Sequence, residues 1–142
     1  MTLKRGNHCA YVTHYHFVFP VKYRYALMSE PIVKYIKEIA LEISIRYELE
    51  VEEVGCDNNH IHLLCSFHPK YPIGKIVRLF KSITARKLFE QFPQIKRDLW
   101  GGEFWSDGYY AATIGERGTI KTLEKYIKSQ GAQPDEVQLK LI

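Results

Sequence analysis

Two spacings of apolar residues alternate along this chain, and their order constrains the fold more than any other feature. In residues 9–22, odd-numbered and even-numbered positions form two distinct sets of side chains, which is the pattern of a β-strand. Residues 30–48 change to a spacing of three and four, and Ser29 and Pro31 stand where a helix would begin, so this stretch predicts a helix. In the predicted strand, one parity holds His14, His16 and Val18, and the other holds Tyr15, Phe17 and Phe19.

The second half of the chain repeats this pattern. Residues 50–56 and 60–67 predict two short strands, joined in a hairpin by the turn-forming residues 57–59. Residues 72–91 recur at helical spacing and predict a second helix. The stretch 101–114, which is rich in glycine and aromatic residues, predicts a loop that leads into a fourth strand.

A third helix is predicted over 119–130, with Gly115 and Gly118 as a flexible joint before it and Gly131 at its end. The whole order is strand, helix, strand, strand, helix, strand, helix. It predicts an α+β fold, a ferredoxin-like or RRM-like antiparallel sheet with helices packed on it. A chain of 142 residues can bury one good core and is too short for two, so we expect one domain over 1–142.

Composition and charge narrow the setting in which the chain acts. Three cysteines without a disulfide-framework spacing, and no apolar run long enough to span a bilayer, predict a cytoplasmic protein with no membrane contact. The net charge of +4 favours an anionic partner. No acidic residue lies between Asp57 and Glu90, and the second helix places basic residues opposite its apolar face, although a solvated surface is the alternative interpretation.

The aromatic residues around Arg24 indicate that the anionic partner is a nucleic acid. Tyr23 and Tyr25 flank Arg24, and aromatic rings and guanidinium groups can stack on unpaired bases. The candidate DNA-binding residues are Lys22, Arg24, Lys75, Arg78, Lys81 and Arg86.

Two His-x-His pairs are candidate metal ligands. His60 and His62 lie one residue apart in a predicted strand, so their imidazoles share a face and could hold one ion. His14 and His16 form a second such pair, and the spacing alone does not choose between them. A zinc site that adds Cys56 and Cys65 is a further alternative, which strand parity disfavours because Cys65 falls on the opposite face from the histidines.

A candidate nucleophile lies in the predicted third helix. Tyr126 and Gln130 are four residues apart and therefore share a helix face. A phenol has a pKa of about 10, so a nucleophilic tyrosine needs nearby positive charge or a metal, and lysines on the same helix could supply part of it. A tyrosine buried in the core is the alternative interpretation. The flanking lysines are Lys121, Lys125 and Lys128.

Read in order, five segments resemble one family, the single-tyrosine HUH transposases of the insertion sequence 200/605 group. The resemblance runs from about residue 11 to residue 130. The segments are Tyr15 to Val18 leading to Lys22-Tyr23-Arg24, Asn59 to Leu63, Arg86 to Phe89, Leu99 to Tyr110, and Tyr126-Ile127 with Gln130.

The resemblance implies a function and assigns the site residues. His60, His62 and Gln130 would be ligands of Mg²⁺ or Mn²⁺, and Tyr126 would be the nucleophile that forms a 5′-phosphotyrosine link with single-stranded DNA. It further implies recognition of DNA hairpins at the ends of an insertion sequence, a homodimer whose active sites are shared between subunits, and association with the nucleoid. The alternative from another class is a non-catalytic single-stranded nucleic-acid-binding module of the same fold.

Overall fold

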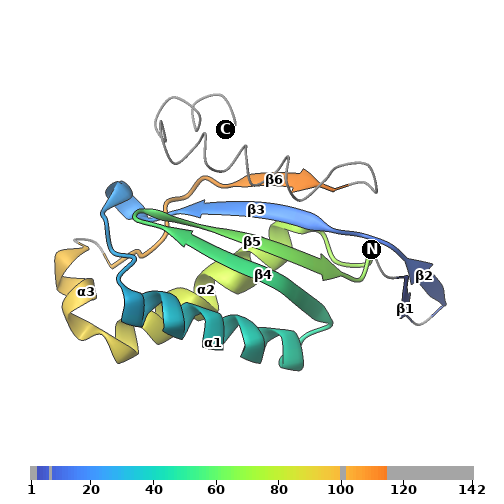
Figure 1. Ribbon diagram of the computed structural model, residues 1–142, viewed down its shortest axis with the longest axis horizontal. Coiled ribbons are helices and arrows are strands. Elements are labelled where there is room, and N and C mark those ends of the chain that lie inside the picture. The colour runs from blue at the N-terminus through green and yellow to red at the C-terminus, as the bar shows by residue number, and fades with distance from the viewer. Residues whose placement is uncertain (1–2, 7, 100–101, 115–142) are drawn as a thin grey trace.

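The computed structural model describes residues 3–6, 8–99 and 102–114, and the predicted third helix, with Tyr126 and Gln130, lies outside these residues. Within them, the main sheet has four strands in the order β4-β5-β3-β6 (Figure 1). Every neighbouring pair is antiparallel, which is the ferredoxin-like arrangement that the sequence predicts. The strands are β3 (Tyr15–Pro20), β4 (Leu49–Asp57), β5 (His60–Phe67) and β6 (Tyr110–Thr113).

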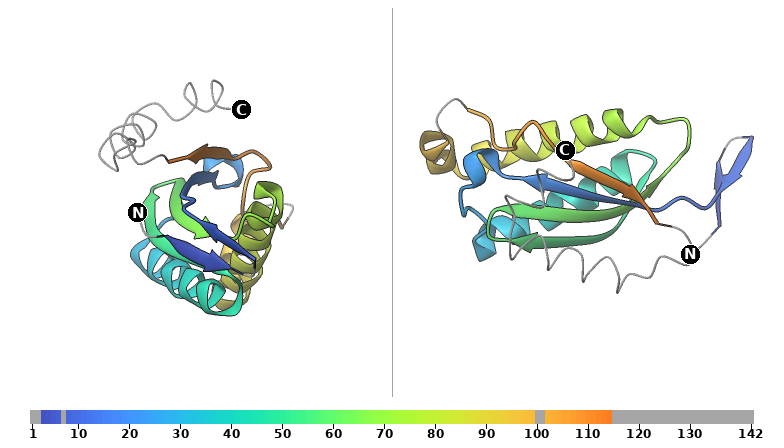
Figure 2. Two further views of the ribbon diagram at one scale, coloured as in Figure 1. Left: turned by 90° about the vertical axis from the view of Figure 1, so that its right-hand side faces the viewer. Right: turned by 90° about the horizontal axis from the view of Figure 1, so that it is seen from above.

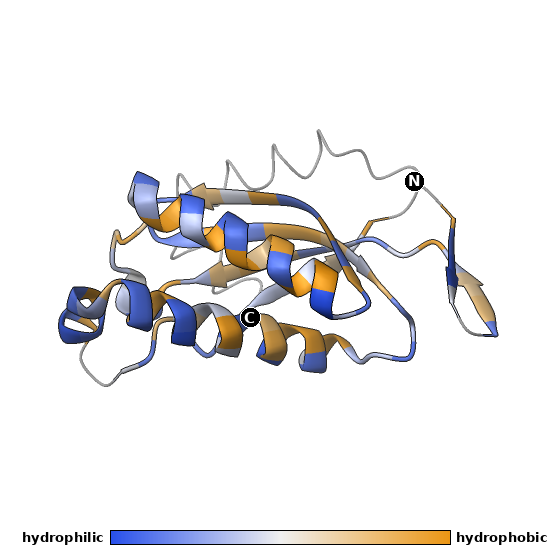
Figure 3. Ribbon diagram, turned by 90° about the horizontal axis from the view of Figure 1, so that it is seen from below, coloured by the Kyte–Doolittle hydropathy of each residue, from blue (hydrophilic) through white to orange (hydrophobic). Residues whose placement is uncertain are grey.

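Two long helices, α1 (Glu30–Arg46) and α2 (Ile73–Gln91), cover the same face of this sheet (Figures 1 and 2). Their apolar sides face inward, so Ile36 of α1 and Phe80 of α2 lie in one buried core with Phe17 and Phe19 of β3. Figure 3 looks onto the two helices and shows hydrophilic and hydrophobic residues alternating along them, as expected for amphipathic helices. The basic outer face predicted for α2 is confirmed, because Lys75, Arg78, Ser82 and Arg86 are all exposed.

The prediction of one continuous strand over 9–22 is wrong. Strand β2 (Cys9–Tyr11) pairs with β1 (Lys4–Gly6) in a separate two-stranded sheet, and β3 begins only at Tyr15. Alternation of side chains reports which face each residue takes but not which strand it pairs with, so two successive strands can carry one pattern. After β3 the chain enters the short 3-10 turn η1 (Lys22–Arg24), which the alternation also does not reveal.

The other predicted helix and strand boundaries within the described residues are correct to within two residues, as is usual for helix and strand ends. A short helix, α3 (Pro93–Asp98), follows α2 and was not predicted; Pro93 begins it, a position where proline is tolerated. Ser29 holds the N-cap position of α1, but its side chain makes no capping hydrogen bond. Among the residues that the structure describes, no helix is both long and apolar enough to cross a membrane.

Candidate active site

The two faces of β5 differ completely in chemistry. Ile61, Leu63 and Cys65 point toward the helices and are 0% exposed. His60 and His62 alternate with them and therefore lie on the opposite face of the sheet, which α1 and α2 leave uncovered (Figure 2). The prediction that the two imidazoles share a face is confirmed, and Cys65 lies on the other side of the sheet from both.

His60 is held by the residue before it. Its Nδ1 lies 3.0 Å from Oδ1 of Asn59. Because an amide oxygen only accepts hydrogen bonds, Nδ1–H of His60 is the donor, and a neutral imidazole then carries its lone pair on Nε2. The residue as a whole is 4% exposed, so packing also restricts the orientation of its side chain. Asn59 thereby sets the tautomer in which Nε2 of His60 is able to bind a metal.

His62 lies across the neighbouring strand β4. It is paired with Gly55, and a Cβ atom at Gly55 would overlap the His62 ring. The ring can take this position only because residue 55 has no side chain. Gly55 therefore gives the His62 imidazole room close to the backbone of β4.

The structure separates the members of the second His-x-His pair. The Nδ1 atom of His14 contacts a carboxylate oxygen of Glu52, which stands where the register of β4 shifts. The His16 ring instead lies edge to face with His62, at 6.1 Å between centroids, and with Tyr110, at 5.8 Å. The sequence did not predict that His16 would lie next to His62, on the same face of the sheet as His60 and His62. The parity of β3 was visible, but the register of β3 on β5 was not.

His16 is a neutral residue in this setting. It is 1% exposed, and burial, with a smaller contribution from His62, lowers the pKa of His16 to about 4. Among the described residues, neither of its ring nitrogens has a hydrogen-bond partner. His16 therefore adds an uncharged polar ring next to His62.

Two of the three predicted metal ligands lie in the described part of the chain. Among residues 3–6, 8–99 and 102–114, no group of three or more His, Cys, Asp or Glu is placed to hold an ion. His60 and His62 provide two nitrogen donors, and the predicted third ligand, Gln130, lies outside the described residues, as does Tyr126. Two imidazoles on one face fit a divalent ion that completes its shell with oxygen ligands.

The predicted DNA-binding residues fall into two groups. Lys75, Arg78 and Arg86 are exposed on α2, whereas Lys22 forms an ion pair with Glu103 at 2.8 Å. Arg24 lies in the same turn as Lys22. These assignments stay predictions.

Lys81 is engaged more firmly than Lys22, because its ammonium group is partly buried and bound to backbone carbonyls. Its Nζ donates to the carbonyl oxygens of Ser106 at 2.7 Å and Gly108 at 3.1 Å, and burial lowers the pKa of Lys81. It holds the loop before β6 against α2.

Comparison with known proteins identifies the family. The sequence model described as "Transposase IS200 like" matches residues 9–130. The ISDra2 transposase TnpA of Deinococcus radiodurans is 34% identical over 130 residues, which cover 92% of each chain. The transposase for insertion sequence element IS200 of Salmonella typhimurium is 31% identical over 116 residues, 82% of this chain and 75% of that one.

Two solved structures share the fold. A structure described as a transposase of Deinococcus radiodurans R1 superposes with a TM-score of 0.74 at 29% identity, over 89% of this chain and 97% of that one. The REP-associated tyrosine transposase bound to a REP hairpin superposes with a TM-score of 0.54 at 12% identity, over 89% and 68%, which is a likeness of fold alone. The family match spans most of the sequence, including the strand that carries the two histidines, and the chain therefore belongs to the IS200-like transposase family.

Proposed function

We propose that this chain is a single-tyrosine HUH transposase, which cleaves and rejoins single-stranded DNA at insertion-sequence ends through Tyr126. The observation that carries the proposal is the shared orientation of His60 and His62 on the face of the sheet opposite α1 and α2, in a chain of the IS200-like family. A pair of fixed imidazoles is an arrangement that can bind a metal, and it lies on the face of the sheet away from α1 and α2.

His60, His62 and Gln130 would hold Mg²⁺ or Mn²⁺. A divalent ion bound there would supply Lewis-acid polarisation of the scissile phosphate. The contribution of the chain is to fix the two nitrogen donors in advance, through the Asn59 hydrogen bond to His60 and the space that Gly55 leaves for His62.

Tyr126 would carry out the covalent step. Its phenolate oxygen attacks the phosphorus atom, a new bond forms between that oxygen and phosphorus, and the bond from phosphorus to the 3′ oxygen breaks. The leaving 3′ oxygen takes up a proton and becomes a 3′-hydroxyl, and the other strand is attached to Tyr126 through its 5′ phosphate. Attack by a 3′-hydroxyl on this link reverses the step, so strand joining needs no ATP.

The partners in this proposal are DNA hairpins and a second copy of the chain. A structural neighbour is bound to a REP hairpin, and the exposed basic residues Lys75, Arg78 and Arg86 of α2 offer a surface for phosphates. Active sites shared between two subunits, and action on chromosomal DNA in the nucleoid, belong to the same proposal.

The test is a covalent-adduct assay. The full chain is incubated with labelled single-stranded oligonucleotides that carry candidate element ends, with Mg²⁺ or Mn²⁺, and is run on a denaturing gel. We expect a shifted band that disappears with EDTA and with Tyr126→Phe, and that persists with Tyr109→Phe. A band that survives Tyr126→Phe would refute the nucleophile, and tight binding with no metal-dependent band would favour the non-catalytic binding module.

A further inference from the structure

The turn η1 lies beside the His60 end of β5. Pro20, two residues before the turn, pairs with His60, and the backbone N–H of Val21 donates to the carbonyl oxygen of Asn59 at 2.8 Å. On its other side the turn is tied to residues 102–106, because the N–H of Lys22 donates to the carbonyl oxygen of Phe104 at 2.8 Å. These bonds fix the turn rigidly between the β4–β5 connection and the loop that leads to β6 (Figure 1).

Tyr23, in the middle of this turn, has an unfavourable backbone conformation. Its φ of 57° and ψ of 14° lie in the left-handed region, which bulky residues rarely adopt and which Gly and Asn adopt at lower cost. Strained conformations of this kind persist where the surrounding structure enforces them, and they cluster at functional sites. The presence of an aromatic side chain here has no explanation in the stability of the turn itself.

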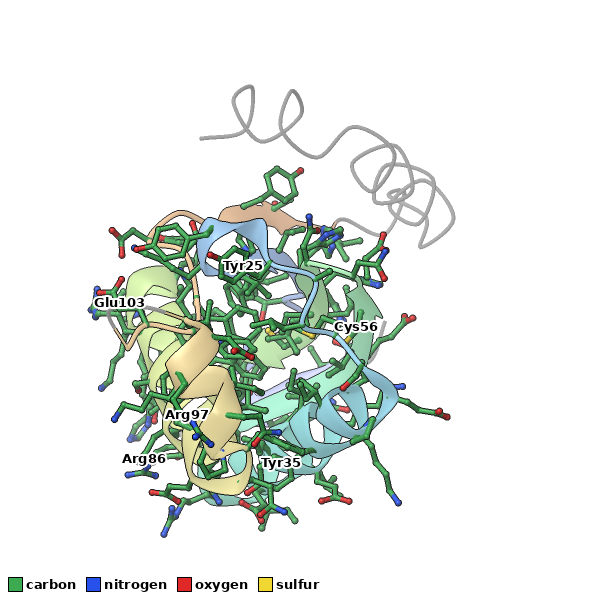
Figure 4. All side chains as sticks on the ribbon, turned by 90° about the vertical axis from the view of Figure 1, so that its left-hand side faces the viewer. Tyr25, Tyr35, Cys56, Arg86, Arg97 and Glu103 are labelled. Atoms are coloured by element: carbon green, nitrogen blue, oxygen red, sulfur yellow. The ribbon has the colours of Figure 1, made fainter. Side chains whose placement is uncertain are left out.

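The side chain of Tyr23 does not contribute to the core either. Tyr23 is 55% exposed and Tyr25 is 45% exposed, and their rings lie 5.8 Å apart at an angle of 50°. Figure 4 looks onto this end of the molecule and labels Tyr25 at its surface, with Glu103 to one side and Cys56 of β4 to the other. Two neighbouring aromatic rings therefore face solvent from a rigid support.

Positive charge lies next to these rings. The ammonium group of Lys22 is 5.6 Å from the centroid of the Tyr23 ring, and because its partner Glu103 is 58% exposed, this weak surface ion pair can give way to a phosphate. A nucleotide combines a flat aromatic base with an anionic phosphate, so rings beside a cation match both of its parts. A base within a duplex is already stacked on its neighbours, which leaves an unpaired base as the fitting ligand.

We propose that Tyr23 and Tyr25 form a stacking site for one unpaired nucleobase of the DNA, beside the His60 end of the metal-binding face. The site takes single-stranded DNA of any sequence, because every base has a stacking face. By holding one base, the turn fixes the position of the strand relative to His60 and His62. The inference rests on the proposed function in one respect only, that the chain binds single-stranded DNA.

The experiment measures binding without cleavage. Unstructured oligonucleotides, each with the fluorescent base 2-aminopurine at a different position, are titrated with the full chain in EDTA. Tyr23→Asn removes the ring but suits the left-handed backbone, Tyr23→Phe keeps the ring, and Tyr25→Ala is a second, independent variant. Tyr47→Ala is the matched control, because Tyr47 is 36% exposed and follows α1 at the other end of the molecule from η1 (Figure 1).

We expect 2-aminopurine fluorescence to be quenched at one position in the wild-type complex and restored there by Tyr23→Asn. Affinity for the single strand should fall about 5- to 150-fold with Tyr23→Asn, the loss that corresponds to one stacked base, and should fall with Tyr25→Ala, while Tyr23→Phe and Tyr47→Ala leave it unchanged. The melting temperature of Tyr23→Asn should equal or exceed that of the wild type.

The inference is overturned if Tyr23→Asn and Tyr25→Ala bind as tightly as Tyr47→Ala, or if no position is quenched. The proposed function fails separately. Absence of any single-strand binding by the wild type would refute both, whereas normal stacking without a Tyr126 adduct would refute only the cleavage reaction.

Discussion

The two faces of the central sheet come from the same strands but serve different purposes. On β5, Leu63 is 0% exposed in the core, while His62, its immediate neighbour, points to the opposite face. On β3, Phe17 packs beneath the helices, while His16 lies beside His62. One face thus forms the apolar core, and the other gathers imidazoles, of which His16 and His60 are buried as well. Substitutions at adjacent residues should therefore have different effects: those on the core face should lower stability, and those on the histidine face should lower activity.

The largest expected effect is the loss of activity on substitution of a histidine on the face of the sheet opposite α1 and α2. His62→Ala removes one of the two imidazole donors, and should reduce metal-dependent cleavage by more than the ~100-fold typical of losing a group that only supports a metal ligand. Its free energy of unfolding should stay close to that of the wild type. Cleavage rates in Mn²⁺ and urea unfolding curves check the two parts. Unimpaired cleavage by His62→Ala would break the comparison.

The next largest effect is a loss of stability on substitution of Leu63, which follows His62 and lies on the face that the helices cover. Leu63→Ala leaves a cavity under the helices and should lower the free energy of unfolding by about 2–5 kcal/mol. Urea denaturation measures it, with Leu41→Ala as the control because Leu41 is 63% exposed on α1. Equal losses for Leu63→Ala and Leu41→Ala would contradict the placement of the core.

A smaller loss should follow from breaking a buried hydrogen bond within the inner layer. Trp105 donates its Nε1–H to Oγ1 of Thr84 at 2.8 Å, and Thr84 is 0% exposed. Thr84→Val keeps the shape but leaves this N–H without an acceptor, at a cost of about 1–3 kcal/mol. Ser82→Ala on the exposed side of α2 is the control and should change little. A neutral Thr84→Val in thermal unfolding would show that the bond is not needed.

The smallest effect concerns Lys81, which links α2 to the loop before β6. Lys81→Met keeps most of the side-chain length but removes the donors to Ser106 and Gly108, and should cost about 1 kcal/mol. Faster amide hydrogen exchange should be confined to the loop over 106–108. If Lys81→Met instead weakens DNA binding without altering exchange, Lys81 contacts DNA as the sequence analysis predicted.

The sequence predicted the layers of the fold because side-chain periodicity is a local property. The faces of β5 and α2 followed from spacing alone, as did the position of Cys65 away from the two histidines. The separate sheet of β1 and β2 did not follow, since β2 continues the alternation of β3 while pairing elsewhere. Pairing depends on contacts between distant residues, which periodicity does not carry.

The candidate site was predictable to a similar degree. His60 and His62 were found from spacing and family resemblance, but the contact of His16 with His62 depends on strand register. Glu52 reaches His14 only because the register of β4 shifts between Val51 and Glu53. The role of Lys81 inside the protein was not predictable for the same reason, because its carbonyl partners at Ser106, Asp107 and Gly108 lie 25 to 27 residues further along the chain.

The central claim is that the face of the sheet opposite α1 and α2 holds the metal for a covalent reaction of Tyr126. The most direct measurement is tandem mass spectrometry of the protein–DNA adduct after digestion with protease and nuclease. The account predicts one modified peptide, with a 5′-linked nucleotide on Tyr126, formed in Mn²⁺ by the wild type and by Leu41→Ala, and absent in His60→Ala and His62→Ala. A nucleotide on another residue, or an undiminished Tyr126 adduct in both histidine variants, would contradict it.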